Sequence, residues 1–221
     1  MTALSSNHAQ LMLAMQSQMN SKICTDWVKE DFPYLRAVII EGAEAIEHHG
    51  WKWWKRQQCD IAQLQMEIVD IWHFILSAIL IKTKNDQNVA MQLLLSVNDK
   101  QLGSNQIEFD GNVYQLSSLN LLAKLELLIG VSVSRRIELD LFSALLKDCQ
   151  MDWGILFRQY VGKNVLNFFR QDHGYKDGSY HKEWQGKEDN EHLVEVMNHL
   201  DSRDPSYPEI LYQQLEARYP G

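Results

Sequence analysis

The most constraining feature of this sequence is the placement of its four prolines, because proline interrupts helices and central strands. They stand at Pro33, Pro205, Pro208 and Pro220, so a long proline-free segment lies between Pro33 and Pro205. Uninterrupted helices are therefore allowed over most of the chain. The sequence predicts an all-α fold, a helical bundle that forms one domain over residues 1–221.

The spacing of apolar residues and the capping residues indicate where the helices lie. Gly50 is a plausible helix stop and Asp60 a plausible N-cap. Loops are expected at 98–116, where Asp110-Gly111 favours a tight turn, and at 172–188. Helices are expected at about 8–28, 34–48, 60–84, 86–97, 117–129, 136–149, 151–171, 189–200 and 207–218.

Composition excludes several classes of protein. Hydrophobic residues make up 45% of the chain, which is enough for a sizeable core, and the net charge of -8 argues against a nucleic-acid surface. The three cysteines form no CxxC pair, which fits a reducing compartment. The N-terminal residues lack the charged start and long apolar run that are typical of a signal peptide. The apolar run IWHFILSAILI is short and follows Glu67 and Asp70, so we expect a buried helix rather than a membrane span. We expect a cytoplasmic protein that binds neither nucleic acid nor a membrane.

Two carboxylate pairs are the strongest functional signal. Glu41 and Glu44 are three residues apart on one predicted helix, and Glu67 and Asp70 are three apart on the next. Residues at this spacing share a helix face. A short linker would fold the two helices into an antiparallel hairpin, so that the four carboxylates converge. Oxygen ligands of this kind suit Mg²⁺, with Mn²⁺ as a possible substitute.

A solvated helix face is the ordinary interpretation of one such pair, and Glu47 fits that interpretation. The pair of Glu67 and Asp70 is harder to explain in this way, because it lies within the apolar stretch QMEIVDIWHFILSAIL. Buried carboxylates are costly unless they are paired or bind metal. A di-iron site is an alternative, because Asp70 and His73 form a DxxH motif. Only one partial match exists, and His73 is more simply a core histidine.

A second polar region follows a predicted helix near residue 170. Lys163, Asn167 and Arg170 form a polar stripe on that helix, and a glycine-containing loop adds Lys176 and Lys182. Alone, this pattern indicates a basic helix end. Beside a carboxylate metal site, it provides the positive charge that a metal–polyphosphate complex requires.

Three stretches, EGAEAI, GWKWWK and QMEIVDIWHFILS, together with YVGKNVLNFFRQDHGYKDGSYHKEW, resemble the dimeric all-α dUTPase family. This resemblance implies the fold of the all-α nucleotide pyrophosphohydrolases and a homodimer. It implies that Glu41, Glu44, Glu67 and Asp70 bind Mg²⁺ at the substrate phosphates. It also implies a water-activating carboxylate in the first pair, assigned to Glu44, with Glu41 as the alternative.

The resemblance further implies roles at the two ends of the substrate. An amide pair, Gln16 and Asn20, would contact the base, although relatives often have a glutamine where this chain has Ser17. Trp51 and the residues up to Lys55 would form a wall or lid. The implied phosphate-binding residues are Lys163, Arg170, Tyr175, Lys176 and Lys182, and the implied nucleoside-binding residues are Gln16, Asn20, Asp70, Asn164 and Asn167.

The resulting hypothesis is Mg²⁺-dependent hydrolysis of dUTP, and possibly of dUDP, with dUMP and pyrophosphate as the products of dUTP. Two alternatives stay open at this point. The chain could be a pyrophosphohydrolase of another nucleotide, such as dCTP or a damaged nucleotide. It could also be a helical protein that binds nucleotides without turnover.

Overall fold

The computed structural model describes residues 3–98 and 105–220. Helices dominate this part of the chain, and the β-structure within it consists of two small antiparallel hairpins. The all-α prediction is therefore confirmed.

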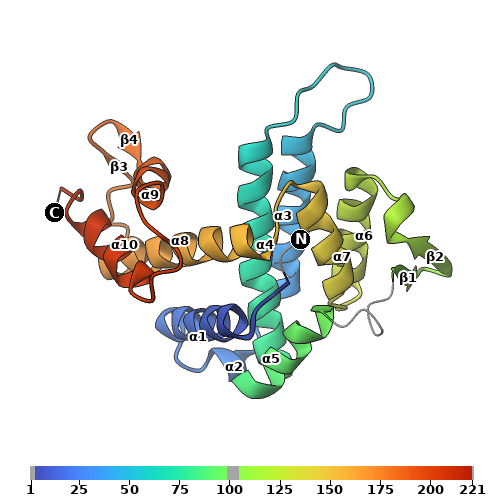
Figure 1. Ribbon diagram of the computed structural model, residues 1–221, viewed down its shortest axis with the longest axis horizontal. Helices are drawn as coiled ribbons and strands as arrows, with labels where there is room; N and C mark the ends of the chain where they lie inside the picture. The colour runs from blue at the N-terminus through green and yellow to red at the C-terminus, as the bar shows by residue number, and fades with distance from the viewer. Residues whose placement is uncertain (1–2, 99–104, 221) are drawn as a thin grey trace.

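A helical hairpin forms the centre of the fold. Helices α3 (Tyr34–His49) and α4 (Ile61–Lys82) stand side by side and are joined by residues 50–60 (Figure 1). The predicted boundaries hold: Gly50 ends α3, and the Asp60 side chain caps α4 by accepting a hydrogen bond from Gln63 N at 3.1 Å. The hairpin thus brings residues 41–44 and 67–70 onto neighbouring helices.

Helix α4 is the main core helix. By length and composition it could cross a membrane, but 67% of its most apolar window is buried inside the protein. Trp72 is fully buried and stacks on Phe142. We therefore assign the apolar character of α4 to its place in the core, as the sequence indicated.

Two further helices pack against α4 and complete the framework of the site. Helix α1 (Ser6–Ile23) and helix α8 (Trp153–Asp172) lie side by side and contact α4 (Figure 1). The Tyr160 hydroxyl on α8 donates to the carbonyl of Met12 on α1 at 2.9 Å. Three segments of the chain that are far apart in sequence therefore meet at one place.

The remaining elements surround this framework. On one side, helix α6 (Leu121–Val133) packs on α3 and is followed by α7 (Leu139–Asp148). At the outer end of α8 lie β3 (Glu183–Trp184), β4 (Lys187–Glu188), α9 (Asp189–Met197) and α10 (Tyr207–Glu216) (Figure 1). The other elements are α2 (Trp27–Glu30), α5 (Gln87–Leu95), β1 (Gln106–Phe109), β2 (Asn112–Gln115) and the short 3-10 turns η1 (Ser96–Asn98), η2 (Leu116–Ser118) and η3 (Tyr175–Asp177).

Several predicted boundaries were wrong. The first helix ends at Ile23 rather than near residue 28, because Cys24 is extended and α2 begins a new turn. The predicted helix at 117–129 begins only at Leu121, where the Asn120 side chain caps it by accepting from Ala123 N at 2.9 Å.

The two predicted loops contain short β-hairpins that the sequence did not reveal. In the first loop, Asp110 and Gly111 both have positive φ and join β1 to β2, which confirms the predicted tight turn. Residues 99–104 of that loop lie outside the described residues. The second loop contains η3 and the β3–β4 hairpin.

Candidate functional site

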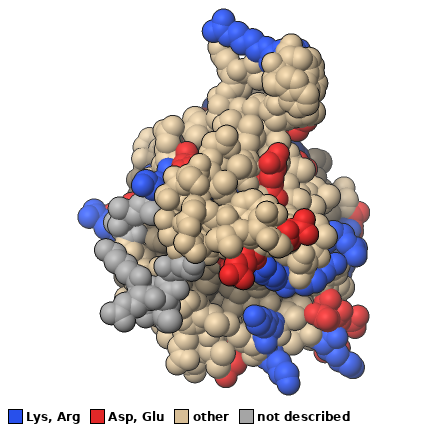
Figure 2. Space-filling view, turned by 90° about the vertical axis from the view of Figure 1, so that its right-hand side faces the viewer, with Lys and Arg blue, Asp and Glu red and all other residues tan. Residues whose placement is uncertain are grey.

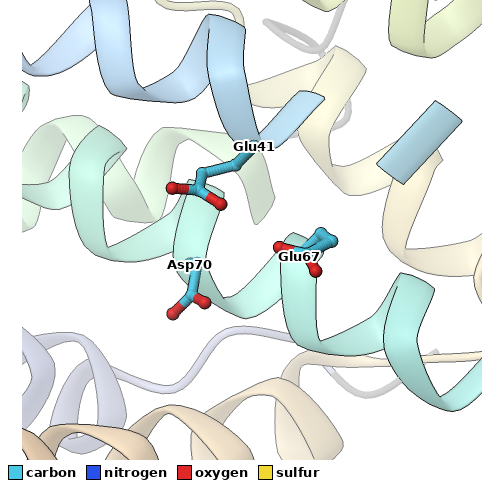
Figure 3. Close-up of side chains that lie close together, drawn as sticks. All are labelled: Glu41, Glu67 and Asp70. Atoms are coloured by element: carbon cyan, nitrogen blue, oxygen red, sulfur yellow. The ribbon is translucent and has the colours of Figure 1, made fainter. Parts of the chain in front are cut away.

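Three carboxylates from the central hairpin form a cluster. Glu41 comes from α3, and Glu67 and Asp70 come from α4 (Figure 3). One oxygen of each lies within 4.8 Å of the others. The structure therefore brings together three of the four carboxylates proposed as metal ligands, and we refer to these three as the carboxylate cluster.

Glu44 lies beside this cluster rather than within it. It is exposed on α3, about one turn after Glu41, and its charge raises the pKa of both Glu41 and Glu67. Glu47 is also exposed, and it accepts a hydrogen bond from the indole of Trp51 at 2.7 Å. Glu47 is thus part of the surface.

The carboxylate cluster consists of closely spaced acids that repel one another. Burial, followed by repulsion from Asp70, raises the pKa of Glu41 to about 8. The same two causes raise the pKa of Glu67. Lys163 balances part of this charge, because its Nζ lies 3.1 Å from Asp70 Oδ2. A hard divalent cation fits this set of close, partly buried oxygen atoms.

His48 is a neighbour of the cluster that sequence reasoning did not select. Its Nε2 lies 3.4 Å from Glu67 Oε1. The spacing in the sequence could have indicated this contact, because His48 follows Glu41 by seven residues and so lies two turns along the same face of α3.

A buried polar cluster lies where α1, α4 and α8 meet. Gln16 Nε2 donates to Asn20 Oδ1 at 3.0 Å and to Ser77 Oγ at 2.9 Å. Asn20 Nδ2 also donates to Ser77 Oγ at 3.0 Å. The structure thus brings the two predicted base-contacting amides together and adds Ser77, which the sequence did not suggest. Gln16, Asn20, His73, Ser77, Tyr160 and Asn164 make up this polar cluster.

His73 belongs to the polar cluster and contacts Gln16. Its Nδ1 lies 2.8 Å from Gln16 Oε1, and because an amide oxygen only accepts, Nδ1 carries the proton. Burial, with a smaller effect from Lys163, lowers the pKa of His73 to about 3, so the ring is neutral. Its Nε2 is therefore an acceptor. Among the described residues, neither His73 Nε2 nor the buried Oδ1 of Asn164 has a hydrogen-bond partner.

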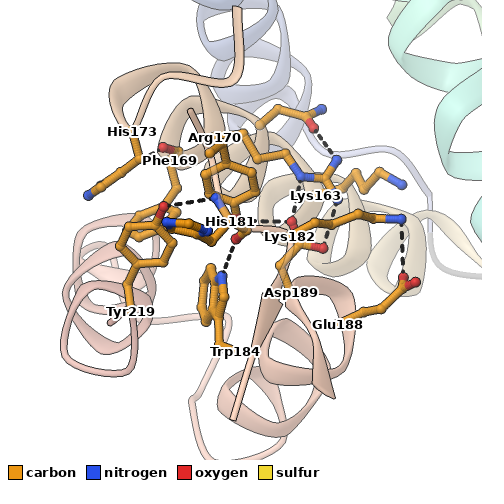
Figure 4. Close-up of polar contacts among 12 residues, drawn as sticks. Lys163, Phe169, Arg170, His173, His181, Lys182, Trp184, Glu188, Asp189 and Tyr219 are labelled. Carbon is orange, nitrogen blue, oxygen red and sulfur yellow. Dashed lines mark hydrogen bonds and ion pairs between the residues drawn. The ribbon is translucent and has the colours of Figure 1, made fainter. Parts of the chain in front are cut away.

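Arg170, predicted to bind phosphate, is held by a buried carboxylate. Its Nε and Nη2 donate to Asp189 at 2.8 and 2.9 Å, and its Nη1 lies 3.4 Å from Asn167 Oδ1 (Figure 4). The Tyr175 ring covers the guanidinium at 5.9 Å. Burial would raise the pKa of Asp189, but the hydrogen bonds and charge of Arg170 outweigh it and lower this pKa.

The other predicted phosphate ligands differ in their exposure. Lys163 is mostly buried beside Asp70, and Lys176 is exposed on η3. Lys182 forms an ion pair with Glu188 at 3.2 Å (Figure 4). The structure thus spreads the basic side chains along α8 and the segment after it, rather than grouping them at one point.

The loop of residues 50–60, which we call the Trp loop, projects from the end of the hairpin (Figures 1 and 2). Trp53 is 86% exposed and Trp54 is 59% exposed, and the two rings pack edge to face with centroids 4.5 Å apart. Trp51 is partly buried and Lys55 is exposed. The loop therefore presents aromatic and basic side chains to the solvent.

Comparison with protein families gives a match that covers most of the site. The model of a family described as dUTPase matches residues 8–175, which is well over half of the chain. This range contains the carboxylate cluster, the polar cluster and Arg170, whereas Lys182 and Asp189 lie beyond it. No curated protein matches the chain.

Proposed function

This chain belongs to the all-α dUTPase family and is a dUTP diphosphatase, and on that premise we propose how its residues divide the work. The carboxylate cluster would hold Mg²⁺ or Mn²⁺ at the substrate phosphates, and Glu44, which the sequence suggested as a fourth ligand, would act beside it on the attacking water. The basic residues of α8 would bind the phosphates, and the polar cluster would form hydrogen bonds with the base. The observation that carries this proposal is the convergence of Glu41, Glu67 and Asp70 within 4.8 Å.

Enzymes of this type generally use a divalent metal. When bound, the ion would supply Lewis-acid stabilisation of the charge that develops on the phosphate oxygens. The protein contributes the geometry: α3 and α4 hold the carboxylates, and Lys163 anchors Asp70 from α8. In the proposal, this anchor would also put an ammonium group beside the phosphates.

Water activation is assigned to the first pair, with Glu44 favoured over Glu41. Glu44 is exposed and lies outside the group of mutually close oxygens, so it can accept a proton from water without giving up a ligand position. Glu44→Gln should therefore lower turnover strongly while leaving Mg²⁺ affinity nearly unchanged. Near-normal turnover of this variant would transfer the role to Glu41.

The unpaired acceptors of the polar cluster favour uracil over cytosine. Uracil presents an N3–H donor, whereas the cytosine ring presents an N3 acceptor. The neutral His73 has an unprotonated, buried Nε2, and Asn164 has a buried Oδ1 without a partner among the described residues. We propose that at least one of these atoms accepts from uracil N3–H. A buried acceptor facing cytosine N3 would be left unpaired, at a cost of about 1–3 kcal/mol.

The phosphate end would be held by Lys163, Arg170 and the residues after α8. Arg170 is partly buried and rigidly held, which suits recognition of phosphate oxygens. Tyr175, Lys176 and Lys182 are exposed around it and would close on the phosphates. These residues would contact phosphate groups, which dUDP also carries. The proposal therefore includes dUDP as a second substrate.

A homodimer in the cytoplasm completes the proposal. Large apolar side chains are exposed on α3 and the Trp loop, notably Ile40 at 53% and Trp53 at 86%. All three cysteines are free, which is compatible with a reducing compartment. Light scattering coupled to size exclusion should give twice the 25.8 kDa chain mass, and a monomer mass would remove the dimer from the proposal.

The experiment that tests the function is pyrophosphate release from dUTP, dCTP, dTTP, dATP, dGTP and UTP, each with Mg²⁺ and with EDTA. Release confined to dUTP with Mg²⁺ supports the metal, phosphate and base assignments together. Metal-dependent release from dCTP would keep the chemistry but overturn the proposal that His73 or Asn164 accepts a hydrogen bond from the base. Phosphate release from dUDP, measured in parallel, tests the second substrate.

A further inference from the structure

Asp189 is a fully buried charged group to which the proposed function gives no role. It is the first residue of α9, and its exposed fraction is 0%. Besides the two Arg170 contacts, its Oδ2 accepts from the Tyr180 hydroxyl at 2.9 Å. A buried carboxylate is tolerated only when such partners satisfy it. Three donors thus converge on this one side chain.

This arrangement fixes which edge of the Arg170 guanidinium is available. Nε and Nη2 both donate to Asp189, so that Nη1 is the guanidinium nitrogen directed away from this carboxylate (Figure 4). Nη1 lies 3.4 Å from Asn167 Oδ1, one turn earlier on α8. Asn167 stands between Lys163 and Arg170 in the sequence of α8, so this contact lies on the Lys163 side of Arg170 along the helix.

The spacing along α8 suits a polyphosphate. Lys163 and Arg170 are seven residues apart on the same face, which corresponds to about 10 Å at the helical rise. Lys163 is already at the metal end, 3.1 Å from Asp70. A chain of phosphates that begins at the carboxylate cluster can therefore reach the free edge of Arg170.

We propose that Asp189 is a positioning residue that holds the Arg170 guanidinium with Nη1 directed at the substrate phosphates. This inference rests on the proposed function, in which Arg170 binds phosphate. It adds a residue beyond the part of the chain that the family match covers, residues 8–175. The segment after α8 thus acts on the phosphate end through Asp189, with Tyr180 holding the carboxylate from a third side.

A purely electrostatic view predicts the opposite effect of removing Asp189. Loss of a negative charge beside Arg170 makes the region more positive, which by Coulomb attraction alone would strengthen phosphate binding. If Asp189 acts by positioning, its loss weakens phosphate binding in spite of the added positive charge. The sign of the change therefore separates the two views.

The test is calorimetric binding of α,β-imido-dUTP with Mg²⁺, compared with deoxyuridine, which has no phosphate. Asp189→Asn should weaken binding of the imido nucleotide about tenfold or more, since hydrogen bonds to charged groups are worth about 1.5–3 kcal/mol. Binding of deoxyuridine should stay within about twofold. Asp189→Glu should recover part of the loss. Asp201→Asn, which removes an exposed carboxylate paired with Arg203, is the matched control.

A double-mutant cycle separates this inference from the proposed function. Arg170→Ala should weaken binding of the imido nucleotide, and Asp189→Asn should then add nothing further in the Arg170→Ala background. If Arg170→Ala has no effect, the phosphate role of Arg170 is wrong and the inference falls with it. If Arg170→Ala weakens binding but Asp189→Asn does not, only the inference is overturned.

A milder variant keeps the test decisive should Asp189→Asn fail to fold. Tyr180→Phe removes one donor to Asp189 and leaves the ion pair in place. It should weaken binding of the imido nucleotide about threefold, again with deoxyuridine unchanged. Equal loss for both ligands, or no loss for either, would identify the Asp189 contacts as structural only.

Discussion

The carboxylate cluster leads to an unusual prediction for the metal-free protein. Replacing one of the carboxylates should raise the free energy of unfolding, whereas most substitutions lower it. Burial and the neighbouring carboxylates raise the pKa of Glu41 from its ordinary 4.5 to about 8. An acid with a raised pKa in the folded state binds more protons when folded than when unfolded. Stability is therefore lost as pH rises from about 4.5 through 8.

The size of this loss follows from the pKa values. A shift from 4.5 to about 8 would correspond to about 5 kcal/mol, at about 1.4 kcal/mol per pKa unit. Glu41 is partly exposed, so solvent screens its neighbours and we expect about 2 kcal/mol. For a chain of this length, that lowers Tm by about 4–8 °C between pH 5 and pH 8.5.

The assay is thermal unfolding in EDTA across this pH range, for the wild type and for Glu41→Gln. The variant cannot ionise at this position, so it should melt above the wild type at pH 8.5 and close to it at pH 5. Glu126→Gln, an exposed change on α6, should show no such pH-dependent difference. Added Mg²⁺ should reverse the order at pH 8.5, because only the wild type keeps the full ligand set.

One result would refute this reasoning. If Glu41→Gln in EDTA melts at or below the wild type throughout the range, then repulsion among the carboxylates does not limit the stability of the metal-free protein. The cluster would then be held apart or neutralised by other groups, and the inference that it needs a cation would lose its main physical support.

Three further predictions concern separate parts of the molecule. Glu67→Gln should fold and yet lose about 100-fold or more of the Mg²⁺-dependent pyrophosphate release, and retained turnover would remove Glu67 from the metal site. Ser77→Ala deprives Gln16 and Asn20 of a shared partner and should raise KM for dUTP about tenfold with a smaller change in kcat; an unchanged KM would separate the polar cluster from base binding. Gly174→Ala should lower stability by about 1–2 kcal/mol in denaturant unfolding, because φ is +86° and a Cβ would collide with Ser179 Oγ; unchanged stability would show that this turn relaxes freely.

The sequence predicted well those parts of the fold whose ends are marked by helix-breaking or helix-capping residues. Helix α3 lies between Pro33 and Gly50, and α4 begins after the Asp60 cap, so both were predicted to within two residues at each end. The hairpin of β1 and β2 was missed because its strands have four residues each, too few for a period-2 pattern. Only the Asp110-Gly111 turn between them had a recognisable signal.

The residues of the candidate site also differ in whether the sequence alone could identify them. Glu41 with Glu44, and Glu67 with Asp70, could be selected because three-residue spacing on a helix places side chains on one face. Ser77 and Asp189 could not, because their roles depend on which helices pack together. Nothing in the eighteen residues between Arg170 and Asp189 encodes that contact locally. It exists only once α9 is folded back against α8.

Under the proposed function, helix α4 contributes to both ends of the site, and this has a consequence for how specificity can change. Glu67 and Asp70 would face the phosphates, and His73 and Ser77 follow on the same helix, about 15 Å from first to last. In this proposal the length of α4 would fix the distance from the metal to the base. A point substitution at the base end leaves that distance intact, so new base preferences are within reach of single mutations. An insertion between Asp70 and His73 would instead turn one end by about 100° relative to the other and disable both.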